Sequence, residues 1–147
     1  MGLKVTAKGK ESALEHEKRK KLGKRSKTKG STYERDTAKK FKKAYNAELV
    51  RTPQSGGFAK KSAKADDFRG DIVPADDSID LSLHIECKNA KTWSLPSWFK
   101  QAESDKPHSK KPIVVFHQHG SSHDFVLLKI TDFVDLLGEC SYEVESA

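Results

Sequence analysis

The chain of 147 residues, 35% of them hydrophobic and 33% charged, suits one domain with a modest core and a part that stays outside it. Its net charge of +7 is uneven: residues 1–64 carry 20 Lys and Arg against 6 Asp and Glu, and residues 65–147 carry 8 against 15, which predicts a polyanionic partner and a separate carboxylate-rich site. The absence of an 18-residue apolar run and of a secretory signal argues against a membrane protein and predicts an intracellular, cytoplasmic one.

Residues 1–29 form a strongly basic amino-terminal segment with almost no large apolar side chains. A segment of this composition cannot bury a face, so we predict a flexible arm in which residues 11–22 form at most a short, solvated helix. Its charge fits a phosphate-binding arm, and it also fits a tail that only keeps the protein soluble.

A helix is predicted from Ser31 to Asn46, with Ser31 as N-cap and Glu34 as the third residue of a capping box. Its inner stripe consists of Tyr33, Thr37, Ala38, Phe41, Ala44 and Tyr45. Glu34 lies on this buried stripe, where an ionised carboxylate is costly unless it is paired or binds a metal. Glu34 is therefore either a capping residue alone or part of a functional site.

Residues 48–52 predict a first strand that ends before Pro53, with Arg51 placed to bind a phosphate. The next residues have the conformational freedom to bring backbone N–H groups close to a nucleic acid strand: Ser55, Gly56 and Gly57. The following loop either wraps a polyanion or is an ordinary exposed loop, and its cations are Lys60, Lys61 and Lys64.

Two further strands are predicted at residues 71–73 and 81–88, joined by an acidic turn. The second strand alternates, with Leu81, Leu83, Ile85 and Cys87 on an apolar side and Ser82, His84, Glu86 and Lys88 on a polar side. We therefore expect a half-buried strand. Antiparallel pairing of the two strands brings Asp71 near Glu86.

The spacing Asp-x14-Glu-x-Lys suggests a metal site. Asp71, Glu86 and the backbone carbonyl of Cys87 supply the hard oxygen ligands that Mg²⁺ prefers, and Lys88 lies about 6.6 Å from Glu86 on the same side of the strand. Such a site activates water for attack on a phosphodiester. Other acids lie in turn-like polar clusters and are not assigned to it: Asp66, Asp67, Asp76, Asp77 and Asp80.

The carboxyl half predicts a helix at residues 96–104, strands at 112–116 and 124–130, and a helix at 131–138 that Gly138 stops. The first helix buries Leu95, Phe99 and Ala102, whereas Trp98 suits either the core or base stacking. The last helix is expected to turn Phe133, Val134 and Leu137 inward, and residues 139–147 to form a loose tail. His117, His119 and His123 have no matching fourth zinc ligand and are interpreted as a polar strand end.

Four ordered motifs resemble the PD-(D/E)xK nuclease superfamily and, within it, the archaeal-type Holliday junction resolvases. They are Gly30-Ser31 with Glu34-Arg35-Asp36, then residues 50–57, then Gly70-Asp71-Ile72-Val73, then Ile85-Glu86-Cys87-Lys88. The chain departs from the pattern in having Gly70 where a proline often precedes the aspartate, a long loop at 59–69 and a basic leader. Together the motifs cover roughly residues 29 to 130 of the chain.

The resemblance implies an α/β, restriction-endonuclease-like core with a central mixed five-stranded sheet flanked by helices, spanning residues 30–138. It implies an enzyme that cuts four-way DNA junctions with Mg²⁺, or Mn²⁺ in its place, as a homodimer, in the host cytoplasm if a phage encodes it. Its catalytic residues would be Glu34, Asp71, Glu86 and Lys88, with Glu34 as a further metal ligand. Contacts to branched DNA are also expected from Lys29, Arg35, the Gly-rich and lysine loops, and Trp93. A related nuclease that cuts flaps or other DNA, and a basic nucleic-acid-binding protein without catalysis, are the alternatives.

Overall fold

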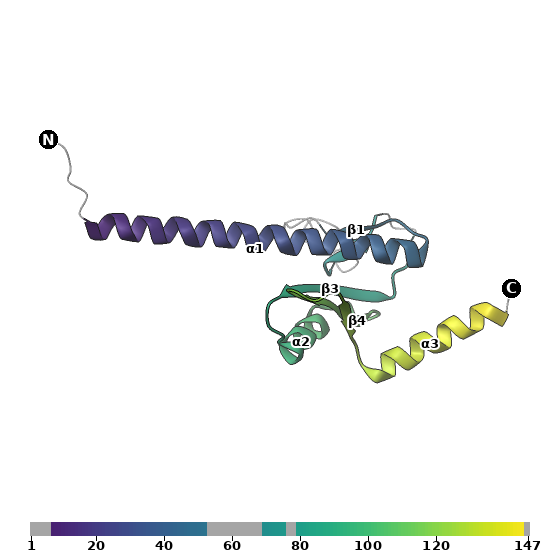
Figure 1. Cartoon of the computed structure of the whole chain (residues 1–147). Helices are drawn as coiled ribbons and strands as arrows, with labels where there is room; N and C mark the ends of the chain where they lie inside the picture. The colour runs from purple at the N-terminus through teal and green to yellow at the C-terminus, as the bar shows by residue number, and fades with distance from the viewer. Residues whose placement is uncertain (1–6, 53–68, 76–78, 146–147) are drawn as a thin grey trace.

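The structure, a computed structural model, describes residues 7–52, 69–75 and 79–145 (Figure 1). Five strands form one sheet in the order β1-β2-β3-β4-β5, and three helices accompany it. The elements are α1 (Ala7–Tyr45), β1 (Leu49–Arg51), β2 (Ile72–Pro74), β3 (Leu83–Ala90), α2 (Leu95–Asp105), β4 (Lys111–Gln118), β5 (Asp124–Leu127) and α3 (Ile130–Glu145). The predicted α/β fold with a mixed five-stranded sheet is confirmed.

The sheet combines antiparallel and parallel pairs. β1 and β3 flank β2 in antiparallel register, whereas β3 and β4 run parallel over eight residue pairs, from Leu83↔Lys111 to Ala90↔Gln118. A parallel pair needs a long crossover, and α2 supplies it. β5 then returns antiparallel to β4 at the edge of the sheet.

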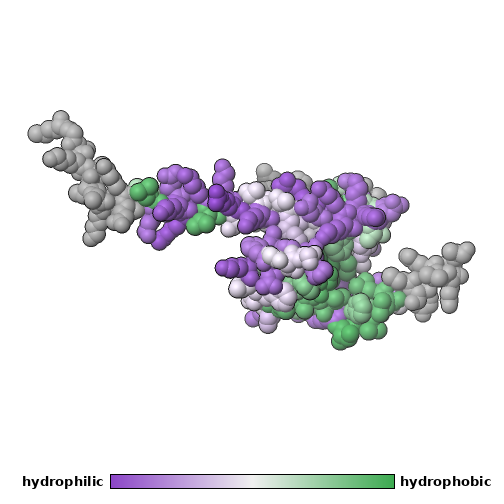
Figure 2. Space-filling model, in the orientation of Figure 1, coloured by the Kyte–Doolittle hydropathy of each residue, from purple (hydrophilic) through white to green (hydrophobic). Residues whose placement is uncertain are grey.

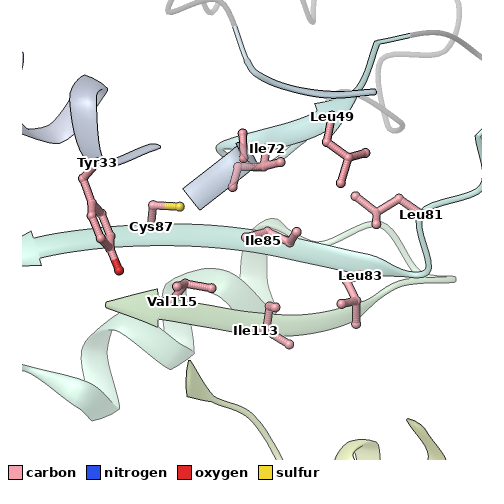
Figure 3. Close-up of a cluster of buried hydrophobic side chains, with 10 residues drawn as sticks. Tyr33, Leu49, Ile72, Leu81, Leu83, Ile85, Cys87, Ile113 and Val115 are labelled. Atoms are coloured by element: carbon pink, nitrogen blue, oxygen red, sulfur yellow. The ribbon is translucent and has the colours of Figure 1, made fainter. Parts of the chain in front are cut away.

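The core has one layer on each face of the sheet. In Figure 1, α1 lies on one side of the sheet and α2 on the other. The α1 side holds a cluster that includes Tyr33, Ile72 and Ile85 (Figure 3), and the α2 side holds Ala102 with Val114 and Phe116. The predicted inner residues of α2, including Trp98, pack against this second cluster.

The prediction of a half-buried β3 is wrong. His84 is 1% exposed and Glu86 7%, although both lie on the polar side of the strand. The reason is that β3 is the central strand and has a helix over each face, as strands in parallel pairs commonly do. The polar side of β3 is therefore a buried polar site and not a solvated surface.

The predicted helix start at Ser31 is also wrong, because α1 begins at Ala7 and runs for 39 residues. Ser31 Oγ donates to the carbonyl of Thr28 at 3.2 Å instead of capping. Residues 7–29, predicted to be a flexible arm, continue the same helix, because their many Lys, Arg, Glu and Ala residues favour helix strongly. Their described side chains are almost all exposed, and this half of α1 extends past the sheet (Figure 1).

α3 differs from its prediction in length and in orientation. It passes through Gly138 to Glu145, so residues 139–145 are helical and not a loose tail. Its predicted inner residues Phe133, Val134 and Leu137 are 45%, 57% and 53% exposed. The opposite side of the helix meets the body, where Lys111 Nζ donates to Glu139 at 2.7 Å. Figure 2 shows the resulting hydrophobic surface where α3 leaves the body.

No helix in the described ranges is long and apolar enough to cross a membrane.

Shortening a core side chain should destabilise the protein more than shortening an exposed side chain of α3. Ile113→Ala should lower the free energy of unfolding by about 2–5 kcal/mol, because the side chain is buried in the core and its removal leaves a cavity. Val134→Ala should change it by about 0.5 kcal/mol or less, because the side chain is exposed on a helix that favours alanine. Urea unfolding of both variants measures this, and an equal loss would show that α3 is packed inward.

Candidate active site at the open edge of β3

The candidate site lies where β2 and β3 separate. Their register contains one residue pair, Ile72↔Ile85, and beyond it the Asp71 N–H donates to the Ile85 carbonyl at 2.8 Å. The next ladder position is filled by a side chain, because the Cys87 N–H donates to Asp71 Oδ2 at 2.7 Å. The carboxylate of Asp71 thus satisfies an amide that the departing strand leaves without a backbone acceptor.

Gly70 allows the two strands to approach at this point. Its φ is +106°, and a Cβ added there would lie 3.1 Å from the Ile85 carbonyl oxygen and 3.2 Å from His84 Nδ1. A larger residue would be strained in conformation and crowded by backbone. Gly70, noted in the sequence only as a departure from proline, is therefore needed to place Asp71.

Glu86 projects from β3 toward the α2 side of the sheet, between two basic side chains of the same strand. Its Oε1 lies 3.6 Å from His84 Nε2 and its Oε2 lies 3.4 Å from Lys88 Nζ. Burial raises the pKa of Glu86, but His84 and Lys88 outweigh burial and hold the pKa below its usual value. Glu86 is therefore the carboxylate of the site that carries its negative charge most readily.

Lys88 is fixed by α2. Its Nζ donates to Gln101 Oε1 at 2.9 Å while it faces Glu86. The sequence alone does not predict this contact, because a glutamine on a short amphipathic helix gives no signal of its direction. The structure places it at the ammonium group of Lys88.

The Asp71 carboxyl has a strongly raised pKa. Burial and repulsion by Glu86 raise the pKa of Asp71 to about 7, against the opposing effects of the Cys87 N–H and Lys88. Two adjacent buried carboxylates repel each other when both are ionised, and a divalent cation relieves this repulsion. The pair therefore has the electrostatic character of a cation site.

The donor set fits a hard cation. In the described part of the chain, no group of three or more His, Cys, Asp or Glu side chains is arranged to hold a metal ion. Asp71 and Glu86 would hold one together with the Cys87 carbonyl, and the other ligands would be water and substrate oxygens. Mg²⁺ is commonly bound in this way, by one or two carboxylates and several waters.

Glu34 has a partner that the sequence did not reveal. Its carboxylate forms an ion pair with Arg51 Nε of β1, and the two side chains are only 14% and 18% exposed. Since α1 does not start at Ser31, Glu34 does not act as a helix cap. It lies close enough to Asp71 to contribute to the raised pKa of that carboxyl. The pairing of a buried Glu34 was expected, but its assignment to Arg51 depends on how α1 crosses β1.

The other predicted DNA contacts are only partly described. Arg35 is exposed and donates to the Ser31 carbonyl, and Trp93 is 43% exposed with its ring against Phe116 and Phe125. His117 Nδ1 lies 3.0 Å from Asp124, an ion-pair geometry and not a zinc cluster. Six predicted DNA contacts and four of the rejected acids lie outside the described residues: Ser55, Gly56, Gly57, Lys60, Lys61, Lys64, Asp66, Asp67, Asp76 and Asp77.

Comparison with known proteins identifies the family. The family model described as "Phage putative PDDEXK endonuclease" matches residues 25–145. No curated protein and no solved structure matches the chain. The match is to the superfamily that the motifs indicated and not to archaeal-type junction resolvases. It covers β2, β3 and α2, which carry Asp71, Glu86, Lys88 and Gln101. The chain therefore belongs to the phage PDDEXK endonuclease family, whose name describes enzymes that hydrolyse nucleic acid and whose superfamily typically uses a divalent metal.

Proposed function

We propose that the protein is a divalent-metal-dependent endonuclease that resolves four-way DNA junctions by paired phosphodiester hydrolysis. The observation that carries the catalytic part of this proposal is the Asp71–Glu86 pair, in which Glu86 is buried and Asp71 half-buried, with Lys88 beside it. A binding protein without catalysis has no need to bury two repelling carboxylates, since their desolvation costs stability.

Each residue of the site has a separate task in this proposal. Asp71 and Glu86 would hold the cation together with the Cys87 carbonyl, and in that position it would supply an activated water and neutralise charge on the phosphate. Lys88, held by Gln101, orients the attacking water or stabilises the negative charge that develops on the phosphorus oxygens. Gln101 is a positioning residue, because it acts through Lys88.

Two features support DNA as the substrate and the junction as its form. The chain combines a basic amino half with an acidic site, which suits a polyanion drawn to a metal centre. The order of the four motifs resembles junction resolvases. Paired cleavage needs two sites, so the proposal includes a homodimer with Mg²⁺, or Mn²⁺, in each site. Flap or duplex cleavage by a related nuclease is the second candidate.

A substrate panel tests the proposal. We expect cleavage of an immobile four-way junction in Mg²⁺, with little cleavage of a linear duplex built from the same arms. Asp71→Asn and Glu86→Gln should each reduce cleavage by several orders of magnitude, because each removes a charged ligand. Asp80→Asn removes an exposed carboxylate outside the site and should cut like the wild type.

Junction binding in EDTA separates a chemical defect from misfolding in the same variants. It should be unchanged or slightly tighter for Asp71→Asn and Glu86→Gln, because each loses a charge that repels phosphate. Preferred cleavage of flaps would favour the second candidate, and wild-type cutting by either carboxylate variant would show that the assigned site is wrong.

The raised pKa of Asp71 predicts a dependence of stability on pH in metal-free buffer. Between its usual value of 3.8 and about 7, the folded protein binds this proton more tightly than the unfolded chain does. The free energy of unfolding contributed by Asp71 should therefore fall as the pH rises through this window.

Urea unfolding in EDTA at pH 5 and pH 8 measures this effect, and Asp71→Asn should show a smaller fall than the wild type. Adding Mg²⁺ at pH 8 should raise the stability of the wild type more than that of the variant, because only the wild type has the full carboxylate pair. An identical response of both proteins to Mg²⁺ would argue against a metal at Asp71.

Glu34→Gln tests whether the carboxylate on α1 supports the site. The change removes the ion pair with Arg51 and the charge near Asp71, so we expect cleavage to fall strongly while junction binding in EDTA is kept. Glu15→Gln is the matched control, because it makes the same substitution at an exposed carboxylate of the same helix, away from the site. Near-wild-type cleavage by Glu34→Gln would reduce Glu34 to a structural partner of Arg51.

A further inference from the structure

A groove lies between the extended half of α1 and the carboxyl ends of β3 and β4. Its α1 wall presents Lys21, Lys24, Arg25 and Lys29, and its other wall includes Asn89 and His119. The volume of the groove is about 810 Å³. A second hollow of about 570 Å³ continues it, sharing Thr28, Lys29, Asn89 and His119. We call the two together the α1 groove.

The charge of the α1 groove is most positive in its first hollow. Among the described residues, no acidic side chain lines the first hollow, whose wall carries the four α1 cations. In the second hollow, Asp36 pairs with Lys39, and Asp124 pairs with Lys40 and His117. The acids of the groove are therefore matched by neighbouring bases, whereas no ion pair involving Lys24, Arg25 or Lys29 is found among the described residues.

The arrangement of these cations suits an extended ligand. Lys21, Arg25 and Lys29 are spaced by four residues, so they form a row along one side of α1, one per helical turn of about 5.4 Å. A row of this kind contacts successive phosphates of a strand, whereas a single small anion would use only one turn. The ligand that matches the groove is a nucleic acid backbone.

The groove reaches β3 one residue beyond the candidate active site. Asn89 is the residue after Lys88, about 3.3 Å further along the strand, and it faces the α1 side of the sheet while Lys88 faces α2. Asn89 Oδ1 is buried and has no hydrogen-bond partner in the described part of the protein. A buried polar atom of this kind requires a partner, which water or a ligand in the groove can supply.

We propose that the DNA backbone entering the candidate active site continues through the α1 groove, with Lys21, Arg25 and Lys29 binding its phosphates. This inference rests on the proposed nuclease function and adds a second binding surface to it. The extended half of α1 is then one wall of the DNA-binding site, and only the side of the helix that faces the groove binds.

The test compares two triple variants of the full-length chain that remove the same charge from the same helix. The groove variant carries Lys21→Ala, Arg25→Ala and Lys29→Ala. The control variant carries Arg19→Ala, Lys20→Ala and Lys27→Ala, exposed residues that do not line the groove. Alanine favours helix, so circular dichroism should show the same helix content for both variants.

Binding of a fluorescent four-way junction is titrated in EDTA over a range of salt concentrations. The groove variant should bind at least about tenfold more weakly than the wild type. The slope of its log binding constant against log salt concentration should be less steep by about 0.9 for each phosphate that the variant no longer binds. The control variant should keep most of its affinity and its full slope.

Three outcomes would overturn the inference. Equally weakened binding in the two variants would show that α1 attracts DNA by charge without a groove, and unchanged binding in both would show that DNA does not touch this part of α1. Either result leaves the nuclease proposal standing, provided that the wild type binds and cuts the junction. A wild-type protein that binds no DNA would overturn both proposals.

Discussion

Two neighbouring carboxylates, the buried Glu86 and the half-buried Asp71, are the constraint on which the rest of the site depends. Asp71 and Glu86 cannot both be ionised at neutral pH without a cost, as the raised pKa of Asp71 records. The protein meets this cost with a backbone N–H from Cys87 and with the nearby ammonium of Lys88. The repulsion that these groups do not compensate favours binding of a cation at the candidate site.

The arrangement of one helix on each face of the sheet makes this burial possible. α1 and α2 cover opposite faces of β3, and each helix contributes one polar side chain near the carboxylate pair. Glu34 comes from α1 and is held by Arg51, while Gln101 comes from α2 and holds Lys88. Five segments of the chain, which are α1, β1, β2, β3 and α2, thus contribute side chains at the point where β2 leaves β3.

The strands and the pairing of Asp71 with Glu86 could be predicted from the sequence, because apolar runs and a polar turn define a hairpin locally. The start of α1 could not be predicted in this way. Ser31 has the local pattern of a helix cap, and only the helix-favouring residues before it show that the helix begins earlier. The burial of Glu86 and the exposure of α3 were missed for a related reason. Both depend on which elements cover a face, and no local pattern records this.

The hydrogen bond from the Cys87 amide to Asp71 gives the site an unusual tolerance of sequence change. The group that aims the carboxylate is part of the main chain, so every residue except proline supplies it at position 87. The side chains at this position can vary in size and polarity to suit the core without redirecting Asp71. In this respect the site is encoded by the course of the backbone, and its geometry can outlast extensive divergence of the residues around it.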